Sequence, residues 1–170
     1  MGLKGRVMEL LRAGDERALG ALASSQPRAI RFLLGRLWDP DEAMRQRAAR
    51  ALGVAAASHR EVGRDLLRRL MWALNDESAT NGLYGIPALA EIGYRDPELI
   101  RPFVAPLASL AWDDGLRPEI LRALARIAEA APELVGPLCG EVAEHVDLES
   151  QAERDALDRL LEVSGGLDES

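Results

Sequence analysis

Apolar residues along this chain recur at the three- and four-residue spacing that places them on one face of a helix. The first clear run comprises Ile30, Leu33, Leu34 and Leu37. A second run follows the polar stretch 38–41 and comprises Ala48, Ala51, Leu52 and Ala55. The two runs predict a pair of amphipathic helices joined by a short turn, each with one apolar face available for packing.

This helix pair recurs along the chain. The Ala-Leu pair at residues 51–52 returns at 88–89 and 123–124, at steps of 37 and 35 residues, and more weakly at 159–160. A self-similar period near 36 residues, with two helices per period, is the signature of an α-solenoid, in which neighbouring pairs bury each other's apolar faces. We therefore predict a single all-α domain with cap helices over 1–24, repeats over 25–58, 59–95, 96–131 and 132–164, and a flexible polar tail over 165–170.

One repeat departs from the pattern over residues 71–93. Its second half has the spacing of an apolar-faced helix, whereas its first half contains Asn81, Gly82, Gly85 and Pro87. These residue types disfavour a helix interior by roughly 0.5–3 kcal/mol each. The segment is predicted to be either a binding site or a structural irregularity, and the residues alone leave both alternatives open.

Three segments carry a resemblance to a known family, namely 47–53 (RAARALG), 86–93 (IPALAEIG) and 120–128. They resemble the HEAT-like repeat proteins, including the subgroup related to phycobilisome lyases, and the likeness covers about residues 27–163. It implies a right-handed α-α superhelix of about four helical hairpins plus an N-terminal cap, with the second helix of each hairpin lining the concave face. Segment 71–78 is also similar to a feature of small bacterial HEAT-like proteins of unassigned role.

The exposed positions on such a concave face form the predicted partner-binding surface. They are Arg45, Arg50, Ser78, Asn81, Tyr84, Glu91, Arg117, Glu119 and Arg126. The start of the irregular segment extends this surface to Trp72, Asn75, Asp76 and Glu77. The alternative is that these residues belong to solvated helix faces and that Asp76 or Ser78 caps a helix. Trp38 and Trp112 share a repeat position and are interpreted as structural clamps between repeats.

Composition acts mainly by exclusion. Hydrophobic residues make up 48% and charged residues 29% of the chain, which is a globular balance, and aromatic residues only 4%, which favours packed helices over a β-sandwich. Cys139 is the only cysteine, so no internal disulfide is expected. No apolar run approaches the roughly 18 residues of a membrane span, and the first residues lack signal-peptide features. We therefore predict a cytoplasmic protein without membrane association.

No catalytic or metal-binding motif is recognisable. His59 and His145 have no His or Cys at metal-ligand spacing, and phosphate-binding and serine-nucleophile glycine motifs are absent. We predict a non-catalytic scaffold or adaptor that binds another protein through the concave face, without metal or cofactor. The alternative is a lyase-like chaperone, or another HEAT-like protein that handles a small molecule or cofactor. Nucleic-acid binding is less favoured, because the net charge is -7 and the isoelectric point is about 5.0.

Overall fold

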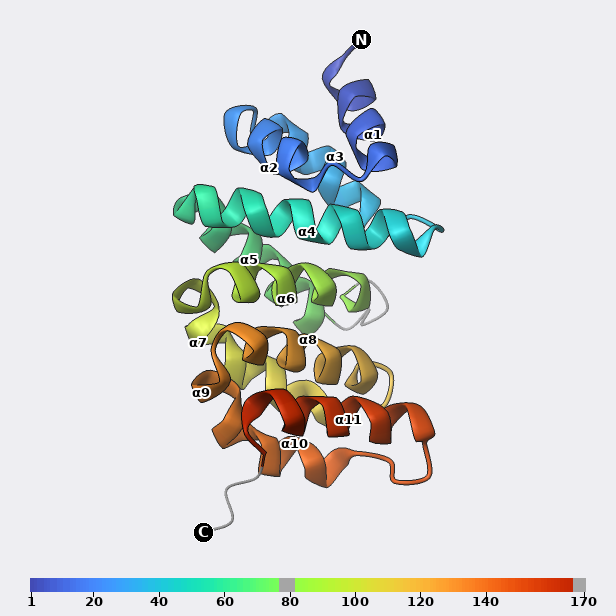
Figure 1. The fold of residues 1–170 in the computed structure, drawn as a ribbon, viewed down its shortest axis with the longest axis vertical. Helices are drawn as coiled ribbons and strands as arrows, with labels where there is room; N and C mark the ends of the chain where they lie inside the picture. Colours follow the sequence, from blue (N-terminus) through green and yellow to red (C-terminus); the bar gives the residue numbers. More distant parts are fainter. Residues whose placement is uncertain (77–81, 167–170) are drawn as a thin grey trace.

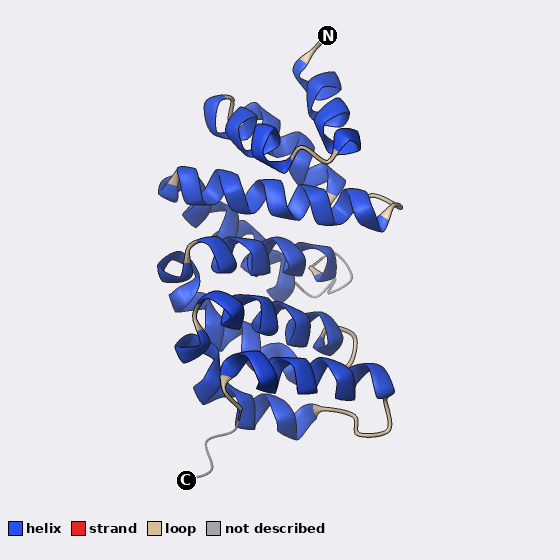
Figure 2. Ribbon diagram, in the orientation of Figure 1, coloured by secondary structure: helices blue, strands red, loops and turns tan. Residues whose placement is uncertain are grey.

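The computed structural model describes residues 1–76 and 82–166, and this part of the chain contains helices and no strand (Figure 2). The all-α class is therefore confirmed for these residues. The α-helices are α1 (Leu3–Ala13), α2 (Glu16–Ser25), α3 (Arg28–Arg36), α4 (Glu42–Ser58), α5 (Arg60–Asn75), α6 (Ile86–Arg95), α7 (Pro97–Ala108), α8 (Arg117–Ala130), α9 (Pro132–Val135), α10 (Cys139–His145) and α11 (Gln151–Ser164). Short 3-10 helices are η1 (Leu83–Gly85), η2 (Ser109–Trp112) and η3 (Gly136–Leu138).

The helices form two layers along the long axis of the molecule (Figure 1). The front layer consists of α2, α4, α6, α8 and α11, and each of these helices packs against the next. The rear layer consists of α3, α5, α7 and the α9–η3–α10 run, while α1 packs on α2 and α3 at the N-terminal end. Helices α1 and α11, the first and last of the described chain, consequently lie at opposite ends of the stack.

Short polar side chains set several helix starts. Side-chain oxygens accept backbone amide hydrogen bonds at the beginning of α2, α4, α7 and α11, from the capping residues Asp15, Asp41, Asp96 and Ser150. Gly14 ends α1 with a φ of 71°, a left-handed conformation that glycine adopts without a Cβ clash. A tight turn between α1 and α2 follows from these two adjacent residues.

The apolar faces predicted from the spacing are buried between the layers. Ala48, Ala51, Leu52 and Ala55 of α4 are fully buried. Neighbouring front-layer helices approach closely, since a Cβ on Gly53 would lie 3.0 Å from the backbone of Glu91, and a Cβ on Gly93 would lie 2.8 Å from Cγ1 of Ile127. Small residues therefore bring α4, α6 and α8 together, which also brings the side chains on their outer surface into one region.

Of the helix-breaking residues of segment 71–93, Gly82, Gly85 and Pro87 lie at or next to the start of α6, and Asn81 lies outside the described residues. Helix α5 ends at Asn75, and the chain resumes with η1 and α6, whose second residue is Pro87. Proline is tolerated in a first helical turn because that turn needs no amide donor there. A Cβ on Gly82 would lie 2.8 Å from Cα of Leu74, so glycine allows the returning chain to pack on α5. A Cβ on Gly85 would lie 3.0 Å from Cδ2 of Leu70 in α5, so Gly82, Gly85 and Pro87 all have a structural explanation.

None of the helices in the described part of the chain combines the length and the apolar character needed to cross a membrane.

Candidate functional site

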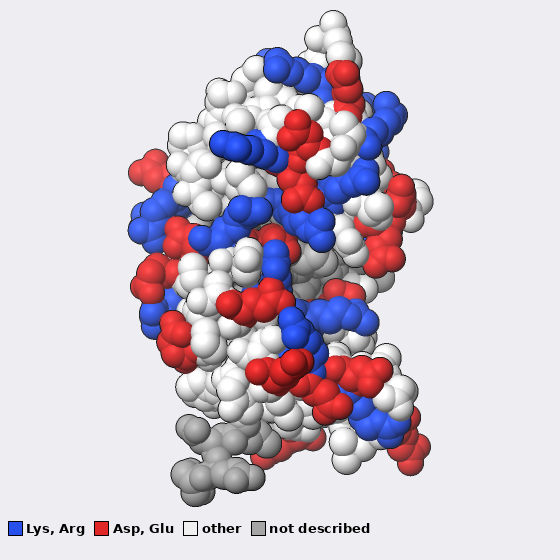
Figure 3. Space-filling model, viewed as in Figure 1, with Lys and Arg blue, Asp and Glu red and all other residues white. Residues whose placement is uncertain are grey.

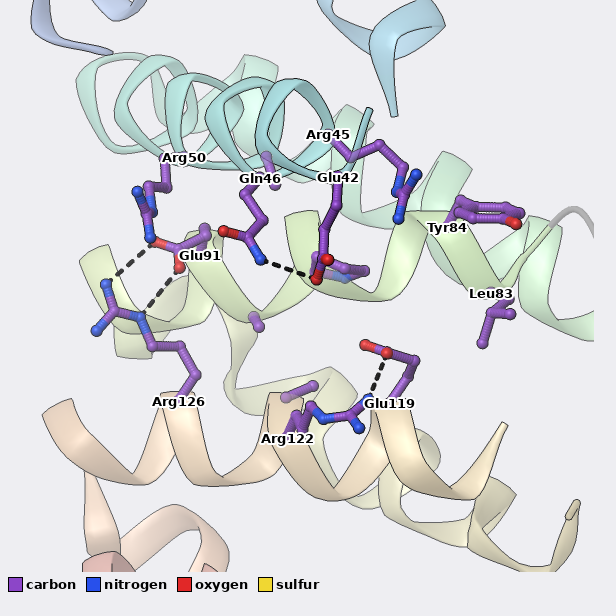
Figure 4. Close-up of a pocket in the computed structure, with 14 residues that line it drawn as sticks. Glu42, Arg45, Gln46, Arg50, Leu83, Tyr84, Glu91, Glu119, Arg122 and Arg126 are labelled. Atoms are coloured by element: carbon purple, nitrogen blue, oxygen red, sulfur yellow. Dashed lines mark hydrogen bonds and ion pairs between the residues drawn. The ribbon is translucent and has the colours of Figure 1, made fainter. Parts of the chain in front are cut away.

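A trough of about 630 Å³ opens on the front layer, across α4, α6 and α8 (Figure 4). Its lining residues are Glu42, Arg45, Gln46, Ala49 and Arg50 from α4; Leu83, Tyr84, Pro87, Ala90 and Glu91 from η1 and α6; and Glu119, Arg122, Ala123 and Arg126 from α8. On this face of the molecule, side chains of both charges are interspersed over the front-layer helices (Figure 3).

The trough has an apolar base and charged walls. Ala49, Ala90 and Ala123 are at most 5% exposed and Pro87 is partly buried, so the base is made of small side chains. Arginines and glutamates with longer side chains surround this base. Such a surface offers close approach for a ligand backbone together with charged groups for specificity.

One end of the trough contains a paired charge cluster. Arg126 donates from Nε to Glu91 at 3.0 Å and from Nη1 to Glu129 at 2.6 Å, and its guanidinium lies over the Tyr94 ring, 3.6 Å from the centroid. Burial opposes the charge of Arg126, but hydrogen bonds to Glu91 and Glu129 outweigh that effect and raise its pKa. Because Glu91 belongs to α6 and Arg126 to α8, this cluster joins two successive front-layer helices.

The other end holds Arg45 and Glu42. Arg45 donates from Nη1 to the carbonyl of Asp39 at 2.7 Å, and its guanidinium lies 5.5 Å from the centroid of Tyr84. Glu42 accepts a hydrogen bond from the amide of Gln46 at 3.3 Å. Within the described ranges, neither Arg45 nor Glu42 forms an ion pair, whereas Arg50 pairs with Glu16 and Arg122 with Glu119.

The structure brings part of the predicted site together. Arg45, Arg50, Tyr84 and Glu91 all line the trough, as do Glu119 and Arg126. Glu77, Ser78 and Asn81 lie outside the described residues. Sequence reasoning missed Glu42, Gln46 and Arg122, although a signal existed, because each lies three or four residues from a predicted member on the same helix face.

Trp72, Asn75 and Asp76, to which the sequence extended this surface, do not line the trough. Trp72 is 72% exposed on α5, which belongs to the rear layer, and it does not line the trough. Asn75 donates to the carbonyl of Met71 at 2.9 Å at the end of the same helix, and Asp76 follows it. The physical reason is that these residues end the first helix of their pair, whereas Tyr84 and Glu91 belong to the returning chain.

The prediction that Arg117 is an exposed surface residue is wrong. Its side chain is 5% exposed and lies at the start of α8 against Glu153 of α11, with an Nη1 to Oε1 distance of 3.3 Å. It also donates to the carbonyl of Ala111 at 2.7 Å and to Asp114 at 2.6 Å. Burial opposes its charge, but Asp114 and Glu153 outweigh that effect and raise its pKa. Arg117 therefore ties two helix pairs together.

Two further observations concern candidate chemistry. Trp38 and Trp112 are 43% and 62% exposed, which does not fit the interpretation as side chains clamped between repeats. Among residues 1–76 and 82–166, no three His, Cys, Asp or Glu side chains converge in a way that could hold a metal ion.

Comparisons with known proteins support the fold more than the function. No known family model matches the chain. A protein of Archaeoglobus fulgidus, described as uncharacterized, is 36% identical over 77 residues, which span 45% of this chain and 41% of that protein's length. The chain thus matches about two fifths of this curated relative. The crystal structure of an engineered protein is similar with a TM-score of 0.51 and 25% identity, covering 91% of this chain and 74% of the other.

Fold and trough together define the class of molecule: an all-helical protein with two helix layers and a charged trough on the front layer.

Proposed function

We propose that this protein is a non-catalytic binding module that holds a segment of a partner protein in the trough across α4, α6 and α8. The scaffold in this proposal is a HEAT-like α-solenoid, with four helical hairpins behind the α1–α2 cap. The contacts within the front layer support the solenoid, because each helix there packs on its neighbours in chain order. The helix pairs also fall within the ranges 25–58, 59–95, 96–131 and 132–164.

The trough itself is the observation that carries the proposal. It crosses three successive helices, and packed helices lie roughly 8–10 Å apart, so its outer walls are about 16–20 Å apart. An extended segment rises about 3.3 Å per residue and would cross this width with about five or six residues. The small base residues allow the backbone of such a segment to approach, and the charged walls offer partners for its side chains.

A peptide is a better fit than a compact small molecule for a reason of composition. Pockets for small molecules are mostly apolar and aromatic with few polar groups. In this trough, four arginines and three glutamates form most of the wall, and Tyr84 is the aromatic side chain among the lining residues. Alternating charges of this kind match a segment with several polar side chains.

The experiment is a selection of random dodecapeptides displayed on phage against the full chain, followed by titration calorimetry with a synthetic copy of an enriched peptide. The variant Gln46→Trp places an indole in the trough from an exposed position of α4. It should weaken binding at least about tenfold, which corresponds to 1.4 kcal/mol. The matched control Arg64→Trp, on an exposed position of rear-layer α5, should leave the affinity unchanged.

Circular dichroism of both variants checks that the helices are retained. Failure to select any peptide, or equal loss of affinity in the Gln46→Trp and Arg64→Trp variants, would contradict the proposal.

A further inference from the structure

Two opposite charges that line the trough have no ionic partner among the residues that the structure describes. Arg50, Glu91, Glu119, Arg122 and Arg126 all take part in ion pairs. Arg45 and Glu42 form none within the described part of the chain, although both line the trough. Charged groups in a partly enclosed surface gain most from a partner of opposite sign, since the effective dielectric there is below that of water. These two side chains are therefore the positions where a ligand adds new ionic contacts.

Hydrogen bonds within the protein orient the guanidinium of Arg45 in a way that suits binding of an anion. Its Nη1 donates to the carbonyls of Asp39 and Pro40, at 2.7 and 3.3 Å, and its guanidinium faces Tyr84 (Figure 4). These contacts fix one side of the planar group, and the Nε and Nη2 donors have no acceptor among the described residues. A guanidinium that is already oriented loses less freedom when it forms a forked pair with a carboxylate.

Glu42 lies one helical turn before Arg45 and projects toward the middle of the trough. The Gln46 side-chain amide donates to Oε1 of Glu42 at 3.3 Å, and Oε2 of Glu42 has no donor among the described residues, so it can accept from a ligand cation. Side chains three residues apart on a helix have Cβ atoms about 5–6 Å apart. Any ligand that contacts both residues must therefore present its acidic and basic groups close together.

We propose that the bound segment carries an acidic side chain that pairs with Arg45 and a basic side chain that pairs with Glu42. These two residues are two to four positions apart along the segment. This inference rests on the proposed function of the trough. On an extended segment, side chains two residues apart share a face about 7 Å apart, and on a helix those three or four apart do so. Both arrangements match the spacing of Glu42 and Arg45.

The anionic group is a carboxylate rather than a phosphate. A phosphorylated side chain carries a charge of about -1.5 to -2 at neutral pH. Glu42, Glu91 and Glu119 line the same trough and would repel a dianion more strongly than a single carboxylate. The ion pairs of Glu91 and Glu119 also occupy Arg126 and Arg122, which leaves Arg45 as the guanidinium in the trough without a carboxylate among the described residues.

A double-mutant cycle between protein and peptide tests this inference. Peptides selected as above should be enriched in an acidic and a basic residue two to four positions apart. Replacing the peptide's acidic residue by alanine should weaken binding to the wild-type chain at least about tenfold, as expected for a lost charge-assisted hydrogen bond. The same replacement should have little effect on binding to Arg45→Ala, because the cycle cancels losses that do not come from the pair.

Two further arms make the assignment specific. Replacing the peptide's basic residue by norleucine should weaken binding to the wild-type chain. The same replacement should not weaken binding to Glu42→Gln, because glutamine keeps the shape and the acceptor oxygen of Glu42 without its charge. The control Arg64→Ala, on an exposed position of α5, should show no coupling with either peptide residue.

The outcomes separate the two proposals. If Gln46→Trp weakens binding of a selected peptide, but the peptide shows no coupling to Arg45 or Glu42, this inference is overturned and the trough remains the binding site. Tighter binding of a phosphoserine version of the peptide overturns the choice of carboxylate. Binding that Gln46→Trp does not affect overturns the proposed function as well.

Discussion

Replacing Arg117 by methionine tests whether one buried ion pair joins the last two helix pairs. Arg117 at the start of α8 and Glu153 in α11 are 5% and 7% exposed, and their charged atoms lie 3.3 Å apart. Methionine keeps most of the apolar volume and removes the charge. Glu153 then retains the amide hydrogen bond from Asp147, at 2.7 Å, and the carbonyl of Ala111 loses its donor.

The expected loss in the free energy of unfolding follows from the Glu153 carboxylate, which stays buried without Arg117. Removing one partner of a buried ion pair typically costs about 3–5 kcal/mol, because the other charge is left uncompensated. The remaining amide hydrogen bond to Glu153 places the Arg117→Met variant near the lower end, at about 3 kcal/mol. The double variant Arg117→Met with Glu153→Met should be more stable than Arg117→Met alone, since it leaves neither charge unpaired.

Urea unfolding followed by circular dichroism gives the free energies of unfolding of the wild type, the single variants and the double variant. Stacked helix pairs are stabilised mainly by their neighbours, and the front-layer neighbour of α11 is α8, which carries Arg117. Amide hydrogen exchange in Arg117→Met should therefore accelerate first in α11. A loss below about 1 kcal/mol for Arg117→Met would refute the reasoning, because that is the range of exposed ion pairs. A double variant less stable than Arg117→Met would refute it as well.

Three other predictions concern packing, titration and specificity. Gly93→Val should destabilise the protein by about 1–3 kcal/mol, because a Cβ there would lie 2.8 Å from Ile127. In the control Gly35→Ala, the new Cβ meets nothing within 4 Å, so this variant should stabilise α3 by up to about 1 kcal/mol. Thermal unfolding of both variants measures these changes. The hydrogen bond from Arg101 lowers the pKa of Glu98 below 4.5. The contribution of this ionised carboxylate to stability is therefore present above pH 4.5 and is lost as the pH falls through the lowered pKa. Carboxyl titration by NMR checks this, and a pKa at or above 4.5 would contradict it. Filter binding with duplex DNA at low salt should show no retention, and retention that falls steeply with salt would instead indicate phosphate contacts.

Local chemistry accounts for the parts of the fold that the sequence predicted. The apolar spacing on α4 is readable because helix geometry places Ala48, Ala51, Leu52 and Ala55 on one face, and this face is buried. The turn at Gly14 and Asp15 within the predicted cap also depends on local chemistry, since capping and left-handed backbone conformations depend on residues within a few positions.

The candidate site was predictable only in part, because its members come from helices far apart in the chain. Six residues that the sequence singled out line the trough, namely Arg45, Arg50, Tyr84, Glu91, Glu119 and Arg126. The residues missed, such as Glu42 and Arg122, share a helix face with predicted members, but they line one trough because α4, α6 and α8 pack in that order.

The sequence by itself determined the helices, their caps and the spacing at which helix pairs recur, because these depend on contacts between residues close along the chain. Only the tertiary structure decided which polar residues face the same space. It placed Trp72 in the rear layer, away from the trough, and buried Arg117 under α11. The physical reason is that an exposed position on one helix stays exposed only if no neighbouring helix covers it, and packing between distant segments determines that neighbour.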